Sequence, residues 1–365
     1  MTRAQVYIHE PIWPFSRLCA LTTAHGVDRS LEIMDPGSAT VRIARNDQAI
    51  TADRLKYGNI LVVTSDVARD WAGPVTLLQE SYSTGEITIG ALEQSAILNV
   101  RPTPLTEQWN SGASGAVFTS IMNRINGRGH TGLFTPDGVP AGPAITDLSI
   151  GGQSALEALG ELFSRTGYEW WLDTAVRPSG ITWTLNWGQK QGEDNADFVV
   201  IRDRHLSDLE YTLDVSKVRQ AVTVVGGFGS LPNRTAVTRT TVGVQGVRDV
   251  GSGAIELADQ ALIDALDVPP ALRSETVFLQ PRTSDQTALS RLAQQALERP
   301  LSGAEKFSAT VNVLFDWTRL GLGDYVTINT ARLGLGAIDR KVRIIGMQPD
   351  EELGELDLVL EVPVR

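Results

Sequence analysis

Two stretches of this 365-residue chain carry the same succession of features. Residues 320–328 read Leu-Gly-Leu-Gly-Asp-Tyr-Val-Thr-Ile, and residues 55–62 read Leu-Lys-Tyr-Gly-Asn-Ile-Leu-Val. In both, a glycine and a polar residue lead into an alternating apolar segment of the kind that forms a β-strand. Each stretch is followed by a loop, a second apolar segment, a turn, and a third apolar segment that opens with Gly-Glu.

The spacing of the glycines supports an internal repeat. Gly58 and Gly85 are 27 positions apart, whereas Gly323 and Gly354 are 31 positions apart. One loop insertion accounts for the difference, because surface loops tolerate changes in length. We align the second segments as 73–78 beside 340–345. The pattern predicts two related small β modules, and a chance similarity between two ordinary hairpins stays open at this point.

Strand-like patterns dominate both ends of the chain. Short apolar segments with period-two alternation, separated by Gly, Pro, Asn and Asp, are typical of an antiparallel sheet or barrel. The predicted strands are 39–43, 60–63, 75–78 and 86–89 near the start, and 307–315, 324–329, 341–347 and 355–362 near the end.

Helical spacing appears between these regions. Apolar residues recur every three or four positions in 117–125, and again in 156–163, where Ser154 is the expected N-cap and Gly167 the stop. A hairpin is predicted over 168–187. Residues 255–266 and 284–299 carry two further helical patterns.

We therefore expect an α+β, mainly β fold in which two similar small antiparallel β-barrels bracket helix-containing α+β middle domains. The expected domains are a first barrel at 1–104, an α+β middle domain at 105–197, strands of the second barrel at 198–229, an inserted domain at 230–283, and a helix with the second barrel at 284–365.

Composition excludes several classes of protein. The chain has 32 Lys and Arg against 43 Asp and Glu, a formal net charge of −11, which disfavours stable DNA or RNA binding. Its single cysteine, Cys19, permits no internal disulfide and no multi-cysteine metal site. We expect no secretory signal and no membrane span, because long apolar runs are absent.

No catalytic, cofactor-binding or metal site is predicted. The four histidines, His9, His25, His130 and His205, are scattered and form no metalloenzyme spacing. Ser114 lacks the G-x-S-x-G context of a serine nucleophile. Cys19 lies among apolar neighbours, as an inert buried thiol would.

Four tryptophans, Trp170, Trp171, Trp183 and Trp187, allow two interpretations. Exposed aromatic faces could stack on sugar rings, which would make a carbohydrate-binding module. Trp183 and Trp187 share one face of their predicted strand, and tryptophan is usually largely buried, so we favour a core role.

The order of modules resembles the baseplate hub and tail-associated proteins of tailed phages and related injection machines. Its sharpest local match is the segment 322–326, Leu-Gly-Asp-Tyr-Val, which enters a barrel strand after the helix expected at 284–299. The resemblance covers most of the chain and fits 230–283 least. It implies a homotrimer at the distal end of a tail tube, in which each barrel resembles a tube subunit.

From this resemblance we expect a structural virion protein of the tail tip, and no enzyme. Three chains would present six similar barrels to a sixfold tail tube or distal tail ring and connect it to tip or fibre proteins, with DNA only in transit through a channel. Assembly would take place in the host cytoplasm. The alternatives are a tail-tip peptidoglycan hydrolase or peptidase, for which we see no room after the second barrel, and the carbohydrate-binding module.

The expected partner interface lies in the loops between the repeated strands, 65–73 and 329–339. Its candidate residues are Asp66, Arg69, Trp71, Arg332, Leu333 and Leu335.

Overall fold

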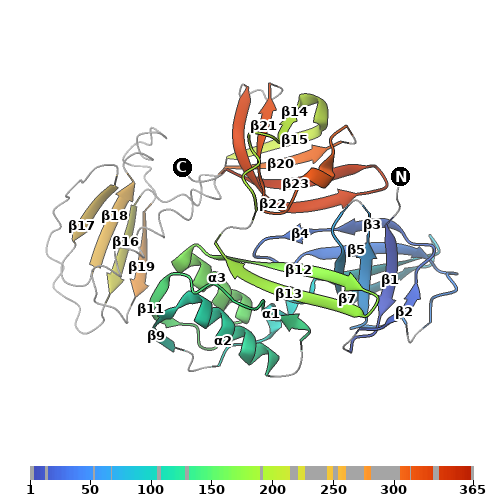
Figure 1. Ribbon diagram of the computed structural model, residues 1–365, viewed down its shortest axis with the longest axis horizontal. Coiled ribbons are helices and arrows are strands. Elements are labelled where there is room, and N and C mark those ends of the chain that lie inside the picture. Colours follow the sequence, from blue (N-terminus) through green and yellow to red (C-terminus); the bar gives the residue numbers. More distant parts are fainter. Residues whose placement is uncertain are drawn as a thin grey trace.

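A computed structural model places most of the chain (Figure 1). It describes residues 4–12, 15–51, 54–66, 68–104, 108–127, 131–189, 192–213, 221–226, 245–249, 254–259, 275–280, 305–312, 314–331 and 337–362. The fold is α+β and mainly β, as predicted. Within the described residues, no helix combines the length and apolarity needed to cross a bilayer.

The first module is a seven-stranded curled sheet. Its strands are β1 (Gln5–His9), β2 (Arg17–Ala20), β3 (His25–Arg29), β5 (Ser38–Ala44), β6 (Ile60–Thr64), β7 (Trp71–Ser81) and β8 (Glu86–Leu92). They are ordered β2-β1-β6-β7-β8-β5-β3 and pair antiparallel. Alternate residues of β5, among them Val41 and Ile43, point into a closed apolar core.

The second module repeats this arrangement. Its strands are β14 (Val200–Arg202), β15 (Leu206–Leu213), β20 (Glu305–Val311), β21 (Tyr325–Thr330), β22 (Ile338–Asp350) and β23 (Glu355–Glu361). The order β21-β22-β23-β20-β15 matches β6-β7-β8-β5-β3 of the first module. The modules differ at one edge, because β14 runs parallel to β21 whereas β1 runs antiparallel to β6.

Equivalent backbone hydrogen bonds define the repeat. The amide of Gly58 donates to the carbonyl of Val75 at 3.1 Å, and the amide of Gly323 donates to the carbonyl of Ile344 at 2.7 Å. Both glycines have a positive φ, +88° and +94°, which favours glycine over residues with a Cβ. The Gly-polar signal in the sequence therefore marks the same turn in both modules.

The turns before β8 and β23 are also equivalent. Gly85 donates to the carbonyl of Ser81 at 3.0 Å, and Gly354 donates to the carbonyl of Asp350 at 2.8 Å. Their φ angles are +68° and +71°. Left-handed glycines close many hairpins, so this turn supports the repeat only together with the equivalent hydrogen bonds of Gly58 and Gly323.

A β-bulge fixes how the second segments align. The register shifts between Val75 and Leu77 in β7, and between Ile344 and Gly346 in β22. Val75 therefore corresponds to Ile344, two positions away from our alignment of 73–78 with 340–345. The extra residues of the second repeat consequently all lie between Gly323 and Ile344, where β21 and β22 form two more cross-strand pairs than β6 and β7.

A helix-bearing middle region lies at the lower centre of Figure 1, beside the first module and below the second. Its elements are α1 (Ile97–Val100), β9 (Gln108–Ala113), α2 (Ser114–Asn126), β10 (Leu133–Phe134), β11 (Ala144–Ser149), α3 (Ala155–Thr166), β12 (Glu169–Arg177) and β13 (Gly180–Gly188). The predicted caps of α3 are confirmed: Ser154 forms a capping box with Glu157, and Gly167 closes the helix at φ +67°.

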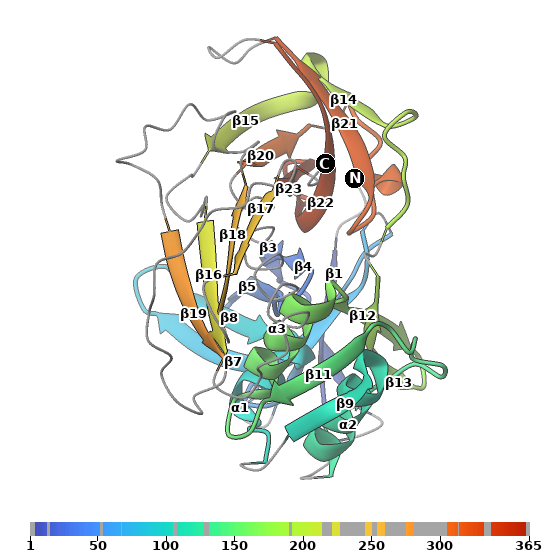
Figure 2. The same cartoon turned by 90° about the vertical axis from the view of Figure 1, so that its left-hand side faces the viewer.

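A separate four-stranded sheet occupies part of residues 221–280. It contains β16 (Ala221–Gly226), β17 (Gln245–Asp249), β18 (Ala254–Asp259) and β19 (Glu275–Gln280), in the order β17-β18-β16-β19. The sheet lies at the left of Figure 1 and at the front of Figure 2.

Two predictions from the sequence differ from the structure of this sheet. The helix predicted at 255–266 is wrong over 255–259, which belong to the strand β18. β16 falls inside the range expected for the second barrel, 198–229, but pairs with β18 and β19 instead. The helix expected at 284–299 lies outside the described residues.

Candidate assembly surface

The two curled sheets are joined by strand pairing. The short strand β4 (Leu31–Glu32) leaves the first module and pairs antiparallel with β22 at Met347 and Gly346. The next residue, Ile33, donates its amide to the carbonyl of Ile345 at 3.2 Å. Backbone pairing at this junction fixes one module against the other.

A buried ion pair lies beside this junction. Arg29 at the end of β3 donates through Nη2 to Oε1 of Glu351 at 2.7 Å, and the two side chains are 1% and 9% exposed. Burial lowers the pKa of Arg29, and the nearby carboxylates of Glu351 and Asp70 oppose that shift. The exposed Glu352 adds a hydrogen bond from the amide of Gly26 at 2.7 Å.

A second buried ion pair joins the second module to the middle region. Both terminal nitrogens of Arg343 on β22 donate to the carboxylate of Glu169 on β12, at 2.7 and 2.6 Å. Glu169 opens the strand whose next residue, Trp170, accepts a hydrogen bond from the amide of Met34 at 3.1 Å. The first module, the second module and the middle region therefore meet at one junction, where the charged side chains are largely buried.

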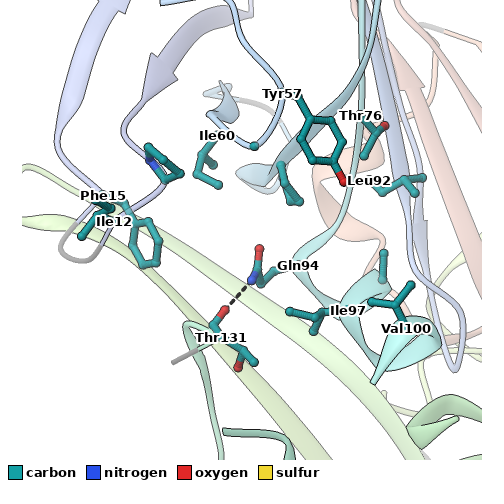
Figure 3. Close-up of a pocket in the computed structure, with 14 residues that line it drawn as sticks. Ile12, Phe15, Tyr57, Ile60, Thr76, Leu92, Gln94, Ile97, Val100 and Thr131 are labelled. Carbon is teal, nitrogen blue, oxygen red and sulfur yellow. Dashed lines mark hydrogen bonds between the residues drawn. The ribbon is translucent and has the colours of Figure 1, made fainter. Parts of the chain in front are cut away.

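An open groove lies between the first module and the segment around α1 of the middle region (Figure 3). Its volume is about 740 Å³ and its lining is mostly apolar. The lining residues are Pro11, Ile12, Phe15, Tyr57, Gly58, Ile60, Pro74, Thr76, Leu92, Gln94, Ala96, Ile97, Val100 and Thr131. Ile12, Tyr57 and Val100 are 73%, 79% and 74% exposed, so three large side chains are accessible along this one groove.

The described residues hold no group of three metal-ligating side chains. The most perturbed carboxyl is that of Glu93, which is 2% exposed and whose pKa burial raises to about 7. Its Oε2 accepts the amide of Gly37 at 3.0 Å, so it closes a turn of the first module. Burial also raises the pKa of the Cys19 thiol. These groups have structural surroundings and do not converge on a cavity.

The structure separates the candidate interface residues into three groups. Asp66 and Arg69 are exposed beside β7, and Arg69 lies 3.7 Å from Asp173 on β12. Trp71, which we expected in the loop 65–73, is instead the first residue of β7 and is fully buried. Its indole packs in the core of the first module and is unavailable to a neighbouring subunit. Arg332, Leu333 and Leu335 lie outside the described residues.

The tryptophan cluster is a core, as the sequence favoured. Trp170, Trp183 and Trp187 are at most 2% exposed. Trp187 stacks on Phe118 of α2 at 5.4 Å between ring centroids, and the indole nitrogen of Trp183 donates to the carbonyl of Ala72 at 3.0 Å. Trp183 and Trp187 therefore hold β13 between α2 and the first module. The faces of all three buried rings are not available for sugar stacking.

Sequence reasoning missed Tyr57, Leu77 and Leu78. Leu77 and Leu78 are 51% and 41% exposed on β7, which is exposed from Thr76 to Glu80. Two adjacent leucines on a strand break the period-two alternation, because one of them must face outward. That break was the available signal.

Comparison with known proteins rests on structure. No family model matches the sequence, and no curated protein matches it. The fold is similar to the 43 kDa tail protein of prophage MuSo2 from Shewanella oneidensis, with TM-score 0.63, 13% identity, and coverage of 99% of this chain and 98% of that one. It is also similar to the tail protein from Neisseria meningitidis, with TM-score 0.64, 14% identity, and coverage of 98% and 96%.

A third similar structure is the Escherichia coli c3393 protein, with TM-score 0.50, 11% identity, and coverage of all of this chain and 75% of that one. It is described as a component of the type VI secretion system with structural similarity to the T4 bacteriophage tail proteins gp27 and gp5. These likenesses extend over nearly the whole chain. The expected resemblance is therefore confirmed at the level of the fold: the chain has the fold of phage tail proteins.

Proposed function

We propose that the protein is a structural component of a phage-like tail tip, where three copies form a hub. The observation that carries this proposal is the presence of two equivalent modules, matched at Gly58 and Gly323 and held together by β4 and the Arg29–Glu351 pair. Three such chains in a closed ring present six similar modules. A ring of that kind fits a sixfold tail tube or distal tail ring on one side and tip or fibre proteins on the other.

The comparisons support this role. Two of the similar structures are tail proteins, and the third is a component of a secretion system described as similar to phage tail proteins. We infer a location at the tail tip of a virion, with assembly in the host cytoplasm. The partners would be further copies of this chain, a tail tube or distal tail protein, and a tip or fibre protein.

The net charge of −11 suits a hub whose channel lets DNA through. An acidic lining repels the phosphate backbone and so prevents the DNA from adhering during transit. This part of the proposal predicts that the lumen of the assembled ring is acidic. A ring with a basic lumen would contradict it.

The first experiment is the mass of the purified full chain, measured by native mass spectrometry and sedimentation over a range of concentrations. The expected species is a trimer, stable alone or formed on addition of the tail tube protein. A chain that remains monomeric both alone and with the tube protein would overturn the hub proposal.

We propose a non-enzymatic role. This proposal is supported by the similar structures, which are described as tail proteins. The rival function is a tail-tip peptidoglycan hydrolase or peptidase. Incubation with labelled peptidoglycan separates the two: release of soluble label by the purified chain, absent from a heat-denatured control, would favour the hydrolase.

A further inference from the structure

The two modules have equivalent surfaces, and one of these surfaces is buried whereas the other is exposed. At one repeat-matched position, Tyr57 precedes Gly58 in the first module and Leu322 precedes Gly323 in the second. Leu322 is 5% exposed and packs into the apolar core of the first module, whereas Tyr57 is 79% exposed and lines the groove of Figure 3. A side chain that the internal junction covers in one module is therefore uncovered in the other.

The same contrast continues along the middle strand of the repeat. Gly346 and Met347 of β22 pair with β4, and their counterparts in β7 are Leu77 and Leu78, which are 51% and 41% exposed. On β22, the edge that pairs with β21 as far as Arg343 continues into the pairing with β4. On β7, the edge that faces β6 has no further strand beyond Val75 among the described residues.

Ile345 and Thr76, which also correspond to each other in the repeat, show the same contrast in burial. Ile345 accepts a hydrogen bond from the amide of Ile33 in the internal junction, and its counterpart Thr76 is exposed beside the groove. An open strand edge flanked by exposed apolar side chains is a template for another strand. The uncovered surface, composed of Tyr57 and residues 76–78, is thus the counterpart of the surface that the first module covers on the second.

We infer that Tyr57 and residues 76–78 form the docking surface for the second module of a neighbouring copy of this chain. The contact would repeat between chains the junction that β4 and β22 make within one chain. Because it joins two different surfaces, it is heterologous, and such contacts close into rings when the rotation permits. The inference rests on the proposed hub, and it names the surface through which the copies of that hub associate.

The test is the double variant Tyr57→Asp with Leu78→Asp, compared with Tyr82→Asp. Tyr82 is a matched control because it is an exposed tyrosine, 91% accessible, on the turn between β7 and β8, and it lies outside both the proposed surface and the second module. We expect the double variant to raise the concentration at which the trimer half-dissociates by about tenfold or more. Its melting temperature, measured at concentrations where both proteins are monomeric, should equal that of the wild type. Tyr82→Asp should leave the trimer intact.

A photo-reactive amino acid at position 57 identifies the partner directly. The expected adduct joins position 57 of one copy to residues 305–362 of another. A trimer whose stability the double variant leaves unchanged, with position-57 adducts only to a tube protein or to other segments, would overturn this inference while leaving the hub proposal standing. A chain that is monomeric alone and with the tube protein would overturn both.

Discussion

Arg343 and Glu169 form a two-pronged ion pair at the meeting point of the three regions, with side chains only 1% and 6% exposed. Neither charge has access to water, so each depends on the other. The Nε of Arg343 also donates to the carbonyl of Gly323 at 3.2 Å, which ties the pair to the repeated turn. The Glu169 carboxylate therefore fixes the second module's middle strand against β12.

Removing Glu169 alone should destabilise the protein strongly. Glu169→Ala leaves a buried guanidinium without its counter-charge, and such a loss costs about 3–5 kcal/mol. Urea unfolding followed by tryptophan fluorescence measures the change. Replacing both partners, Glu169→Leu with Arg343→Met, should recover much of the loss, because an apolar pair leaves no buried charge.

The control for that experiment is an exposed ion pair. Arg45 and Glu80 lie 2.6 Å apart with side chains about half exposed, and such pairs contribute little. Glu80→Ala should leave the unfolding midpoint almost unchanged. A Glu169→Ala protein no less stable than Glu80→Ala would contradict the role of the buried pair.

The Arg29–Glu351 pair should hold the two modules at a fixed angle. Nε and Nη1 of Arg29 have no hydrogen-bond partner in the described residues. The bond from Nη2 to Glu351 is therefore the one hydrogen bond that holds this guanidinium there. Glu351→Ala should accelerate limited proteolysis between the modules and lower the melting temperature. Glu352→Ala, which removes an exposed carboxylate from the same turn, should have a much smaller effect; equal effects would argue against the pair as a fixed joint.

Glu93 should make stability depend on pH. Its pKa is about 7 in the folded protein, against the ordinary value of 4.5. The folded state therefore binds the proton more tightly than the unfolded state between these values, and the free energy of unfolding falls as pH rises from about 4.5 to 7. The separation corresponds to about 3 kcal/mol in total, with no further loss from this group above pH 7.

Glu93→Gln isolates this contribution. The amide still accepts a hydrogen bond from the amide of Gly37 but does not ionise, so the variant should be more stable than the wild type at pH 8. The gap between the two proteins should close toward pH 4.5. Parallel pH profiles of the unfolding free energy for the two proteins would contradict a raised pKa at Glu93.

Trp71 should matter for folding and not for docking. Its side chain is fully buried at the start of β7, and truncating a buried tryptophan to alanine costs about 3–5 kcal/mol. Trp71→Ala should therefore lower the melting temperature sharply, whereas Arg69→Glu at an exposed site nearby should not. A Trp71→Ala chain with normal melting and impaired assembly would restore Trp71 as an interface residue.

The repeat was predictable from sequence because its turns need particular residues. Gly58 and Gly323 occupy left-handed positions that other residues adopt at a cost. The turn therefore requires glycine at one position, and that requirement is visible in the local sequence. The alignment of the second strands was off by two for a physical reason. A period-two pattern looks the same after a shift of two residues, and the register is settled by the bulges beside Val75 and Ile344 and by the hydrogen bonds that these residues accept from Gly58 and Gly323.

Exposure at the candidate surface was not predictable in the same way. Tyr57 and Leu322 hold the same place in the repeat and are both apolar, yet one is open and the other is buried. The difference arises from which module docks on which, a tertiary relationship that a local pattern does not carry. Trp71 illustrates the converse error, since β7 begins four residues before the apolar alternation that we read as its start.

The repeat equivalence itself can be tested through one pair of side chains. At the cross-strand position after the bulge, the first module pairs Leu77 with Gly90, and the second pairs Gly346 with Val359. The large and small residues have exchanged strands. A Cβ added at Gly346 would lie 3.2 Å from the Cβ of Val359, a close contact that requires the neighbour to move.

Gly346→Ala should therefore destabilise the second module by about 1–3 kcal/mol, the usual cost of overpacking. Val359→Gly introduced together with it should recover part of that cost, because it removes the Cβ that the new methyl group contacts. The matched pair in the first module, Gly90→Ala with and without Leu77→Gly, should behave in the same way, since a Cβ at Gly90 would lie 3.0 Å from the Cβ of Leu77. Unfolding midpoints of the six proteins, including wild type and the Val359→Gly single variant, provide the measurement. Rescue in one module and none in the other would show that the two pairs are not equivalent. The exchange of large and small residues between the strands would then not support a repeated fold.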